Sequence, residues 1–264
     1  MVPTHMNVVR TGPRGAEPVV LLHSAGLDLT YWDAQIEALS GDADVVAMDL
    51  PTHGRSGGAS ADATIESMSR AAAGVLDALG AGAVHLVGLS VGGLVAQTVA
   101  LDRPDLVGTL SLLDTAARFS PPGQQAMRAR AATAREEGVA AVLDGLLQHW
   151  ILPSTRELRP HLVDRMTKTV LGHDPGAHAA LWEAIAAFDC ADRLRDVAVP
   201  TLVLVGDQDS SSPVSSAQEL ADLLPRSEMH VLDGCAHLSP LENPTAVSRH
   251  LRRFVSRHRA TAAA

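Results

Sequence analysis

The sequence predicts an α/β fold: a mostly parallel central sheet with helices on both faces and an all-helical segment inserted into the chain. Short apolar runs alternate with helical patterns between residues 18 and 114. Only helical patterns, rich in Ala, Leu and Arg, occupy residues 121–189, and the alternation resumes at residue 200. Strands and helices that alternate at this rhythm favour a parallel sheet covered on both faces.

The first part of the chain supplies most of the expected sheet. Buried strands are expected at residues 18–23, 44–48, 84–87 and 109–114, with a weaker edge strand at 6–10. Helical patterns are found at residues 31–39, 61–79 and 94–100. Either Asp28 or Thr30 is expected to cap the first of these helices.

The segment of residues 121–189 is too long to be a loop between two strands, and it contains no strand pattern of its own. The residues that punctuate the stretch include Gly138, Pro153, Pro160 and Pro175. We therefore expect a core made of residues 1–120 and 190–264, into which residues 121–189 are inserted as a helical cap. The remaining expected elements are strands at 200–205 and 228–232 and a last helix from Asn243–Pro244 to about residue 255.

Length and composition indicate one large globular domain, or a core with an insertion. No apolar run approaches the ~20 residues that span a bilayer, and no basic region followed by an apolar run is found after Met1. We therefore expect neither a membrane partner nor a secretory signal. The two cysteines, Cys190 and Cys235, do not make a disulfide framework, which favours a cytoplasmic location.

The balance of charges is acidic, with 21 basic residues, 30 acidic residues and a net charge of −9. This balance argues against nucleic acid or an anionic membrane as a main partner. The sequence contains no His-Glu-x-x-His motif and no paired cysteine ligands, so neither a metal nor an organic cofactor is expected. The expected partner is a small molecule, and the oligomeric state is left open.

The motif Gly88-Leu89-Ser90-Val91-Gly92 lies where an expected strand runs into an expected helix. A turn at this place must be tight, and side chains two positions either side of the serine would collide with the neighbouring strand and helix. The turn lifts the serine hydroxyl clear of the sheet, at a helix N-terminus that favours developing negative charge. The motif is typical of a nucleophilic serine. The alternative is a glycine-rich turn whose serine only caps the helix.

A nucleophilic serine needs a base that takes its proton and a third group that orients the base. Asp209 follows one of the later expected strands, and His237 follows the next. Ser90, Asp209 and His237 thus occur in the order that predicts a catalytic triad on an α/β sheet. Two alternative acids remain: Asp207, for which holding the turn is a sufficient role, and Asp114, which follows a different strand.

The oxyanion formed during acyl transfer needs two backbone N–H donors. Val91, directly after the serine, is expected to supply one of them. Ala25, in the loop after the first buried strand, is expected to supply the other, and the alternative is an ordinary turn containing Gly26. His23 is expected to brace this loop, and His53 lies in a turn rich in Gly and Ser, so neither is expected to be the base.

Five segments resemble α/β-hydrolases of the 3-oxoadipate enol-lactonase type, and the resemblance covers nearly the whole chain. The segments are LLHSAGLDLTYWDAQ, AMDLPTHGRS, HLVGLSVGG, PTLVLVGDQDSSSP and GCAHLSPLENP. The last four are shared widely among capped esterases, haloperoxidase-like enzymes and C–C hydrolases. The resemblance therefore implies the α/β-hydrolase fold and the triad more than it implies a substrate.

The helical segment carries the features that this resemblance connects with substrate. Gln148-His149-Trp150-Ile151 stands where the lactonases typically carry Arg-Trp-Phe, and residues 174–185 resemble their late cap helix. His149 and Trp150 are therefore candidate pocket residues, with packing in the core of the cap as the alternative for Trp150. Because His149 replaces an arginine, the resemblance implies a neutral or differently charged lactone.

Several other residues of chemical interest are expected to have structural roles. Trp32, Trp182 and Cys235 are expected to pack in the interior. The arginines of the helical segment are expected on solvated helix faces, although one of them could reach the cleft: Arg128, Arg130, Arg135, Arg156 and Arg159.

These observations predict a serine hydrolase that cleaves a small carboxylic ester or lactone through an acyl-enzyme on Ser90. One alternative is a non-hydrolytic enzyme of the same fold, such as a cofactor-free haloperoxidase, a lyase or a biosynthetic cyclase, which would keep the triad. The other is a non-catalytic receptor, which would not need Ser90, Asp209 and His237 together.

Overall fold

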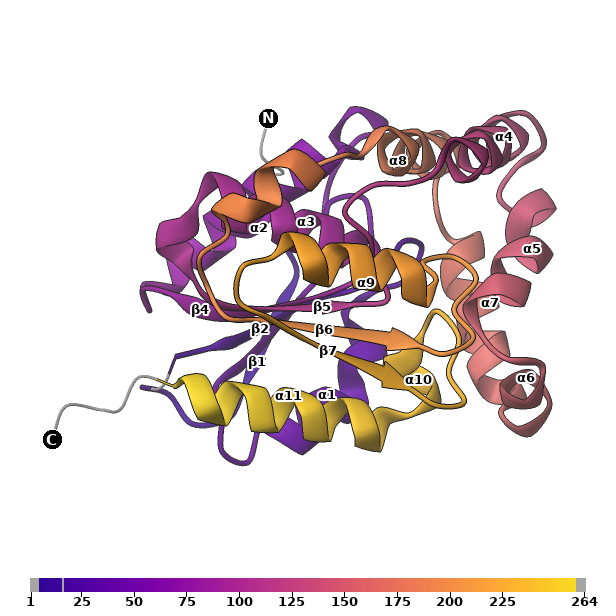
Figure 1. The fold of residues 1–264 in the computed structure, drawn as a ribbon. Coiled ribbons are helices and arrows are strands. Elements are labelled where there is room, and N and C mark those ends of the chain that lie inside the picture. The colour runs from indigo at the N-terminus through magenta and orange to yellow at the C-terminus, as the bar shows by residue number, and fades with distance from the viewer. Residues whose placement is uncertain (1–4, 16, 260–264) are drawn as a thin grey trace, which may run out of the picture.

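A computed structural model describes residues 5–15 and 17–259, and seven strands within these residues form one sheet (Figure 1). Across the sheet the strands follow the order β1 (Val8–Thr11), β3 (Val45–Met48), β2 (Val19–Leu22), β4 (Val84–Leu89), β5 (Val107–Leu113), β6 (Thr201–Gly206) and β7 (Ser227–Leu232). β1 runs antiparallel to β3, and the other neighbouring strands are parallel. The fold class predicted from the sequence is therefore confirmed.

Helices cover both faces of the sheet. Helices α1 (Asp33–Leu39) and α11 (Pro244–His258) lie on one face, and α2 (Ile65–Leu79), α3 (Val91–Asp102) and α9 (Val214–Leu223) lie on the other (Figure 1). All residues of β2, β3, β4 and β6 are buried. Strands that are buried on both faces read as continuous apolar runs, which is why most of them can be recognised in the sequence.

Several helix boundaries differ from those expected. The helix expected from residue 61 begins at Ile65, because the hydroxyl of Thr64 caps it by accepting a hydrogen bond from the Ser67 N–H, and a short 3₁₀ turn precedes it. Asp28 caps the segment before α1, where its carboxylate accepts from the N–H of Thr30. A four-residue helix that was not expected, α10 (Ser239–Glu242), precedes α11.

Five helices follow one another between β5 and β6: α4 (Pro121–Glu137), α5 (Ala140–Trp150), α6 (Pro153–Leu158), α7 (Pro160–Leu171) and α8 (Pro175–Ala187). We call them the helical insertion. They lie at one end of the sheet, beyond the carboxyl ends of β6 and β7 (Figure 1). Four of them begin with proline. The N–H groups of a first helical turn have no partner within the helix, so a residue without an N–H costs no hydrogen bond there. Helices α4 and α8 pack along one another.

Among the helices of the described residues, none is both long enough and apolar enough to cross a membrane.

Candidate active site

Ser90 occupies the turn between β4 and α3, at the centre of the sheet. Its backbone has φ 54° and ψ −116°, a conformation that few residues other than glycine adopt. The surroundings hold it there, since the Ser90 N–H donates to the carbonyl of Leu113 at 2.9 Å and the Thr115 hydroxyl donates to the Ser90 carbonyl at 2.9 Å. Strain that is maintained in this way is a frequent property of functional sites.

The two glycines of the motif are required by the close approach of backbone atoms. A Cβ atom on Gly88 would lie 2.2 Å from the carbonyl oxygen of Gly92, and one on Gly92 would lie 2.3 Å from the carbonyl oxygen of Leu22. Both distances are far inside van der Waals contact. The spacing of Gly88, Ser90 and Gly92 therefore has a steric origin that a simple helix cap would not need.

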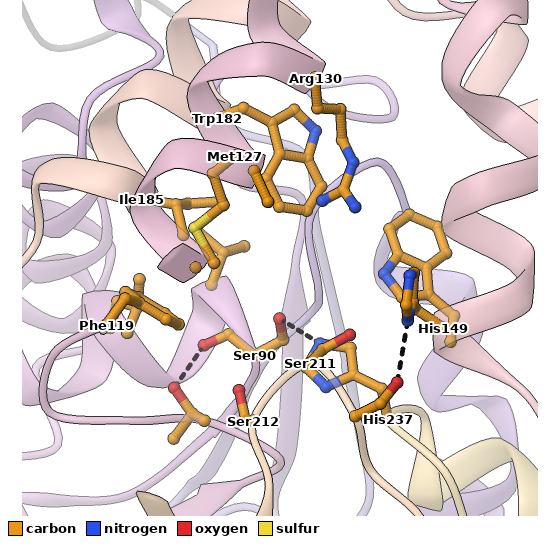
Figure 2. A pocket seen from close by; sticks show the side chains of 17 residues that line it. Ser90, Phe119, Met127, Arg130, His149, Trp182, Ile185, Ser211, Ser212 and His237 are labelled. Atoms are coloured by element: carbon orange, nitrogen blue, oxygen red, sulfur yellow. Dashed lines mark hydrogen bonds between the residues drawn. The ribbon is translucent and has the colours of Figure 1, made fainter. Parts of the chain in front are cut away.

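The loop after β7 brings His237 to the serine. Its Nε2 atom lies 2.9 Å from the hydroxyl oxygen of Ser90 (Figure 2). Its Nδ1 atom lies 2.9 Å from Oδ2 of Asp209. His237 and Asp209 are each 4% exposed. The three residues that the sequence singled out are thus joined by hydrogen bonds in the order Ser–His–Asp.

The carboxylate of Asp209 is fixed by its own loop. Its second oxygen accepts from the backbone N–H groups of Ser211 and Ser212, at 2.8 and 2.9 Å. An ionised carboxylate accepts hydrogen bonds only, so the Nδ1 atom of His237 must carry the proton of their shared bond. Nε2 of His237 is then free to accept from the Ser90 hydroxyl.

The environment of His237 makes its imidazole a stronger base. Burial alone lowers its pKa, but the charge of Asp209 and the hydrogen bond to Asp209 outweigh burial, so the pKa of His237 is raised above its ordinary value. The imidazolium that would form when Ser90 loses its proton is thereby stabilised.

The two alternative acids have other partners. Asp207 is exposed, and its carboxylate accepts from the N–H of Cys235 at 3.1 Å, which holds the turn as anticipated. Asp114 is fully buried, and its carboxyl accepts from the N–H of Gly206 and from both the N–H and the hydroxyl of Ser239. Burial, and then the nearby charge of Asp209, raise the pKa of Asp114 to about 8.

The two candidate oxyanion donors lie on neighbouring strand ends. Val91 follows Ser90 directly and lines the pocket described below. Ala25 follows β2, which pairs with β4, and its side chain is buried without lining that pocket. Neither N–H donates a hydrogen bond to another atom of residues 5–15 or 17–259, so both remain available to an incoming oxyanion.

A pocket opens above Ser90, between the sheet and the helical insertion (Figure 2). Its cavity volume is about 150 Å³, the volume of a cavity that holds a benzene-sized molecule. Apolar side chains make up much of its wall: Leu94, Phe119, Met127, Trp150, Trp182 and Ile185. Polar side chains also face it, among them Ser90, Arg130, His149, Ser210 and His237.

Both candidate pocket residues of the insertion line this pocket. Nδ1 of His149 lies 2.9 Å from the hydroxyl of Ser210, in the loop that also carries Asp209. Trp150 is 2% exposed, and its carbonyl accepts from the N–H of Leu238, next to His237. Trp150 therefore both packs in the interior and borders the site, which combines the two roles considered for it.

Residues 17–244 match the family model of the α/β hydrolase fold. The chain belongs to the α/β-hydrolase fold family. Among curated proteins it is similar to 3-oxoadipate enol-lactonase 2 of Acinetobacter baylyi, with 26% identity over 252 residues, which are 96% of this chain and 93% of the relative.

Two solved α/β-hydrolase structures extend the similarity to the arrangement of the whole fold. An enol-lactonase from Burkholderia xenovorans has a TM-score of 0.90 and 29% identity, covering 95% of this chain and 96% of that one. A thermophilic esterase from Thermogutta terrifontis, studied with malate bound, has a TM-score of 0.89 and 31% identity, covering 98% of each chain.

Two residues of this α/β-hydrolase lie in the pocket although a structural role was expected. Trp182 is buried, as anticipated, but it also lines the pocket. The sequence predicts solvated helix faces for five arginines, one of which could reach the cleft, and Arg130 is that residue. Arg128, two positions earlier, is exposed. The buried neighbours Ala131 and Ala134 on the same helix are the signal that marks the inward side of α4.

Glu242 is a buried acidic residue that sequence reasoning missed. Its carboxylate accepts from the N–H of Leu152 at 2.8 Å and from the hydroxyl of Thr155 at 2.6 Å, both in the helical insertion. The same carboxylate accepts from the N–H of Ala236, beside His237. Glu242 thus connects the insertion of this α/β-hydrolase to the loop of the imidazole.

The described residues of the α/β-hydrolase contain no group of three or more His, Cys, Asp or Glu side chains that could hold a metal ion. Of the remaining candidates, Cys235 is fully buried, and Nε2 of His23 accepts from the N–H of Leu50 at 2.9 Å, which ties two loops together.

Proposed function

We propose that the chain is a serine hydrolase that cleaves a small carboxylic ester or lactone. The observation that carries this proposal is the short contact between the Ser90 hydroxyl and Nε2 of His237, 2.9 Å apart at the floor of the pocket. A hydroxyl becomes a useful nucleophile at neutral pH when an oriented base can take its proton.

The reaction then proceeds in two halves. Ser90 Oγ attacks the substrate carbonyl while His237 Nε2 takes the hydroxyl proton, and Asp209 stabilises the imidazolium. The N–H groups of Val91 and Ala25 receive the oxyanion. His237 then passes its proton to the leaving alcohol, which leaves an ester between the acyl group and Ser90. Water, deprotonated by His237, releases the acid in the second half.

The similarities favour an ester or a lactone as the substrate class. An enol-lactonase and an esterase are among the relatives that align over nearly the whole chain. We propose a reaction of the 3-oxoadipate enol-lactonase type, with residues 1–120 and 190–264 as the hydrolase core and residues 121–189 as an inserted cap. In this proposal the cap selects the substrate, and His149 and Trp150 contribute to that selection.

The test replaces the nucleophile. Ser90→Ala should lower the turnover of short-chain esters by about a millionfold, the scale measured when a serine nucleophile is removed from another hydrolase. Mass spectrometry should detect the wild-type protein with an acyl group on Ser90 after mixing with a reactive ester. Circular dichroism shows whether the variant is folded.

Three outcomes would contradict the proposal in different ways. Near-wild-type turnover by folded Ser90→Ala excludes Ser90 as the nucleophile. The absence of an acyl-enzyme with reactive esters favours a non-hydrolytic reaction on the same triad. Tight ligand binding without turnover, unchanged by Ser90→Ala, favours a receptor.

A further inference from the structure

Arg130 extends from α4 into the pocket above Ser90. Figure 2 shows its guanidinium beside Trp182, directed into the space between Trp182 and His149. The guanidinium carbon lies 4.3 Å from the centre of the Trp182 ring, so the cation is stacked on an aromatic face. Stacking fixes the plane of the guanidinium and leaves its edge, with the N–H donors, free.

These donors have no acceptor within the protein. None of the N–H groups of Arg130 donates a hydrogen bond to another described residue, and no Asp or Glu side chain lines the pocket. Arg135, on the same helix, shows the usual arrangement, since it pairs with Glu183 at 3.0 Å. Arg130 is half-buried, and burial lowers its pKa, which reflects the cost of keeping this cation away from water without a counter-charge.

A purely structural role explains only part of this arrangement. An apolar side chain packed on Trp182 could also hold α4 against α8. Packing of the two helices therefore does not explain why this position is an arginine, whose donors point into a cavity of about 150 Å³ in a protein of net charge −9. A carboxylate offers two acceptor oxygens that match the guanidinium edge and supplies the missing charge.

We propose that Arg130 binds a carboxylate of the substrate, so that the ester or lactone cleaved at Ser90 carries an anionic group on its acyl part. This inference rests on the proposed function and names its substrate class. Because the cavity is small, the carboxylate and the scissile carbonyl belong to one short chain, as in a half-ester or a lactone acid. Arg130 on α4, rather than the residue at position 149 on α5, thus provides the cation for the carboxylate.

The test uses two esters of equal length. Monomethyl glutarate carries a carboxylate where methyl pentanoate carries a methyl group, and proton release reports the hydrolysis of both. The ratio of their kcat/KM values should favour the anionic ester in the wild-type protein. In Arg130→Gln this ratio should fall by about 10- to 100-fold, the range of a hydrogen bond to a charged group, mainly through KM of the anionic ester.

Two further variants separate charge from packing. Arg130→Lys keeps the positive charge without the planar fork, so it should retain part of the preference. Arg128→Gln alters an exposed arginine of the same helix, whose guanidinium donates to the side chain of Gln124 at 3.4 Å, and should leave the ratio unchanged. A wild-type ratio of one or less, or an unchanged ratio in folded Arg130→Gln, would overturn the assignment.

A binding measurement distinguishes failure of this inference from failure of the proposed function. Calorimetry should show glutarate binding to Ser90→Ala and at least tenfold weaker binding when Arg130→Gln is added. If Ser90→Ala still cleaves both esters, the proposed function fails, while glutarate binding still tests Arg130. If cleavage depends on Ser90 but glutarate binding does not depend on Arg130, only the carboxylate assignment fails.

Discussion

Asp114 and Ser239 are joined by two hydrogen bonds in the interior, one from the Ser239 N–H at 3.0 Å and one from the Ser239 hydroxyl at 2.6 Å, both to Oδ2 of Asp114. The other oxygen of Asp114 accepts from the N–H of Gly206 at 3.0 Å. A single buried carboxyl thus connects the strand end that precedes Asp209 with the segment that follows His237. It positions the partners of Ser90 without touching them by a hydrogen bond.

Removal of this carboxyl should therefore cost stability. Asp114→Ala leaves two buried backbone N–H groups without partners, and each such group costs about 1–3 kcal/mol. We expect the free energy of unfolding, measured with urea, to fall by at least that amount. Asp207→Asn, at the exposed acid of the same region, should change it by less than about 0.5 kcal/mol. Equal effects of the two variants would contradict this role of Asp114.

The pH dependence of ester cleavage should report His237. Only the neutral imidazole can take the proton of Ser90, and the charge of Asp209 raises the pKa of His237 despite burial. The rate constant kcat/KM should therefore decrease as the pH falls through a midpoint above 6.5.

The variant Asp209→Asn tests the cause of that midpoint. Loss of the carboxylate removes the contribution that raises the pKa of His237 and leaves burial, so the midpoint should move down. The rate should also fall by about 10⁴-fold, as when the acid of a serine protease triad is replaced. A midpoint that does not move would show that Asp209 is not the group that sets it.

Buried histidines should make the fold sensitive to acid. Burial lowers the pKa of His173 and of His178 to about 4, and it lowers the pKa of His23 and of His53 as well. The unfolded chain therefore binds protons that the folded chain does not bind. Above about pH 6.5 the histidines are neutral in both states and do not reduce the free energy of unfolding. As the pH falls from there toward about 4, the unfolded chain takes up these protons and the free energy of unfolding decreases.

Urea unfolding at several pH values measures this loss. His173→Gln removes one of the groups and should reduce the loss between pH 6.5 and 4.5, whereas His161→Gln, at an exposed histidine, should not. His237 acts in the opposite direction because its pKa is raised. Constant stability across this range would show that the four histidines are protonated in the folded protein.

The steric origin of the serine motif can be tested with two glycines. Gly92→Ala would place a Cβ atom 2.3 Å from the carbonyl oxygen of Leu22, so we expect a lower melting temperature and loss of ester cleavage. Gly74→Ala is the matched control in the middle of α2, where a Cβ atom meets nothing within 4 Å. This variant should be more stable by about 0.5–1 kcal/mol. A neutral Gly92→Ala would contradict the steric explanation.

The parts of the molecule that the sequence predicted well depend on local patterns and on one rule of topology. Strands such as Val84–Leu89 are recognisable because burial on both faces demands a continuous apolar run. The approach of Ser90, Asp209 and His237 follows from the rule that carboxyl ends of parallel strands share one edge of a sheet. Both inferences need only the order of elements along the chain.

The parts that escaped prediction depend on packing between distant segments. Whether Arg130 faces solvent or the pocket is decided by the rotation of α4 against α8, for which the buried Ala131 and Ala134 are a local guide. Glu242 is a lone acid in an apolar segment, and its partners Leu152 and Thr155 lie in another part of the sequence. Side chains whose role depends on a partner in space have no periodic signature.

The attachment of the helical insertion to the loop of His237 has a consequence for how new specificities can arise. The carbonyl of Trp150 and the carboxylate of Glu242 bind this loop to the junction of α5 and α6, so substitutions there should disturb the position of His237 together with the pocket. Arg130 and Trp182 contact the pocket from α4 and α8, outside that junction. Under the proposed function, exchange of these two helices should change the ligand preference and leave Ser90, Asp209 and His237 in place.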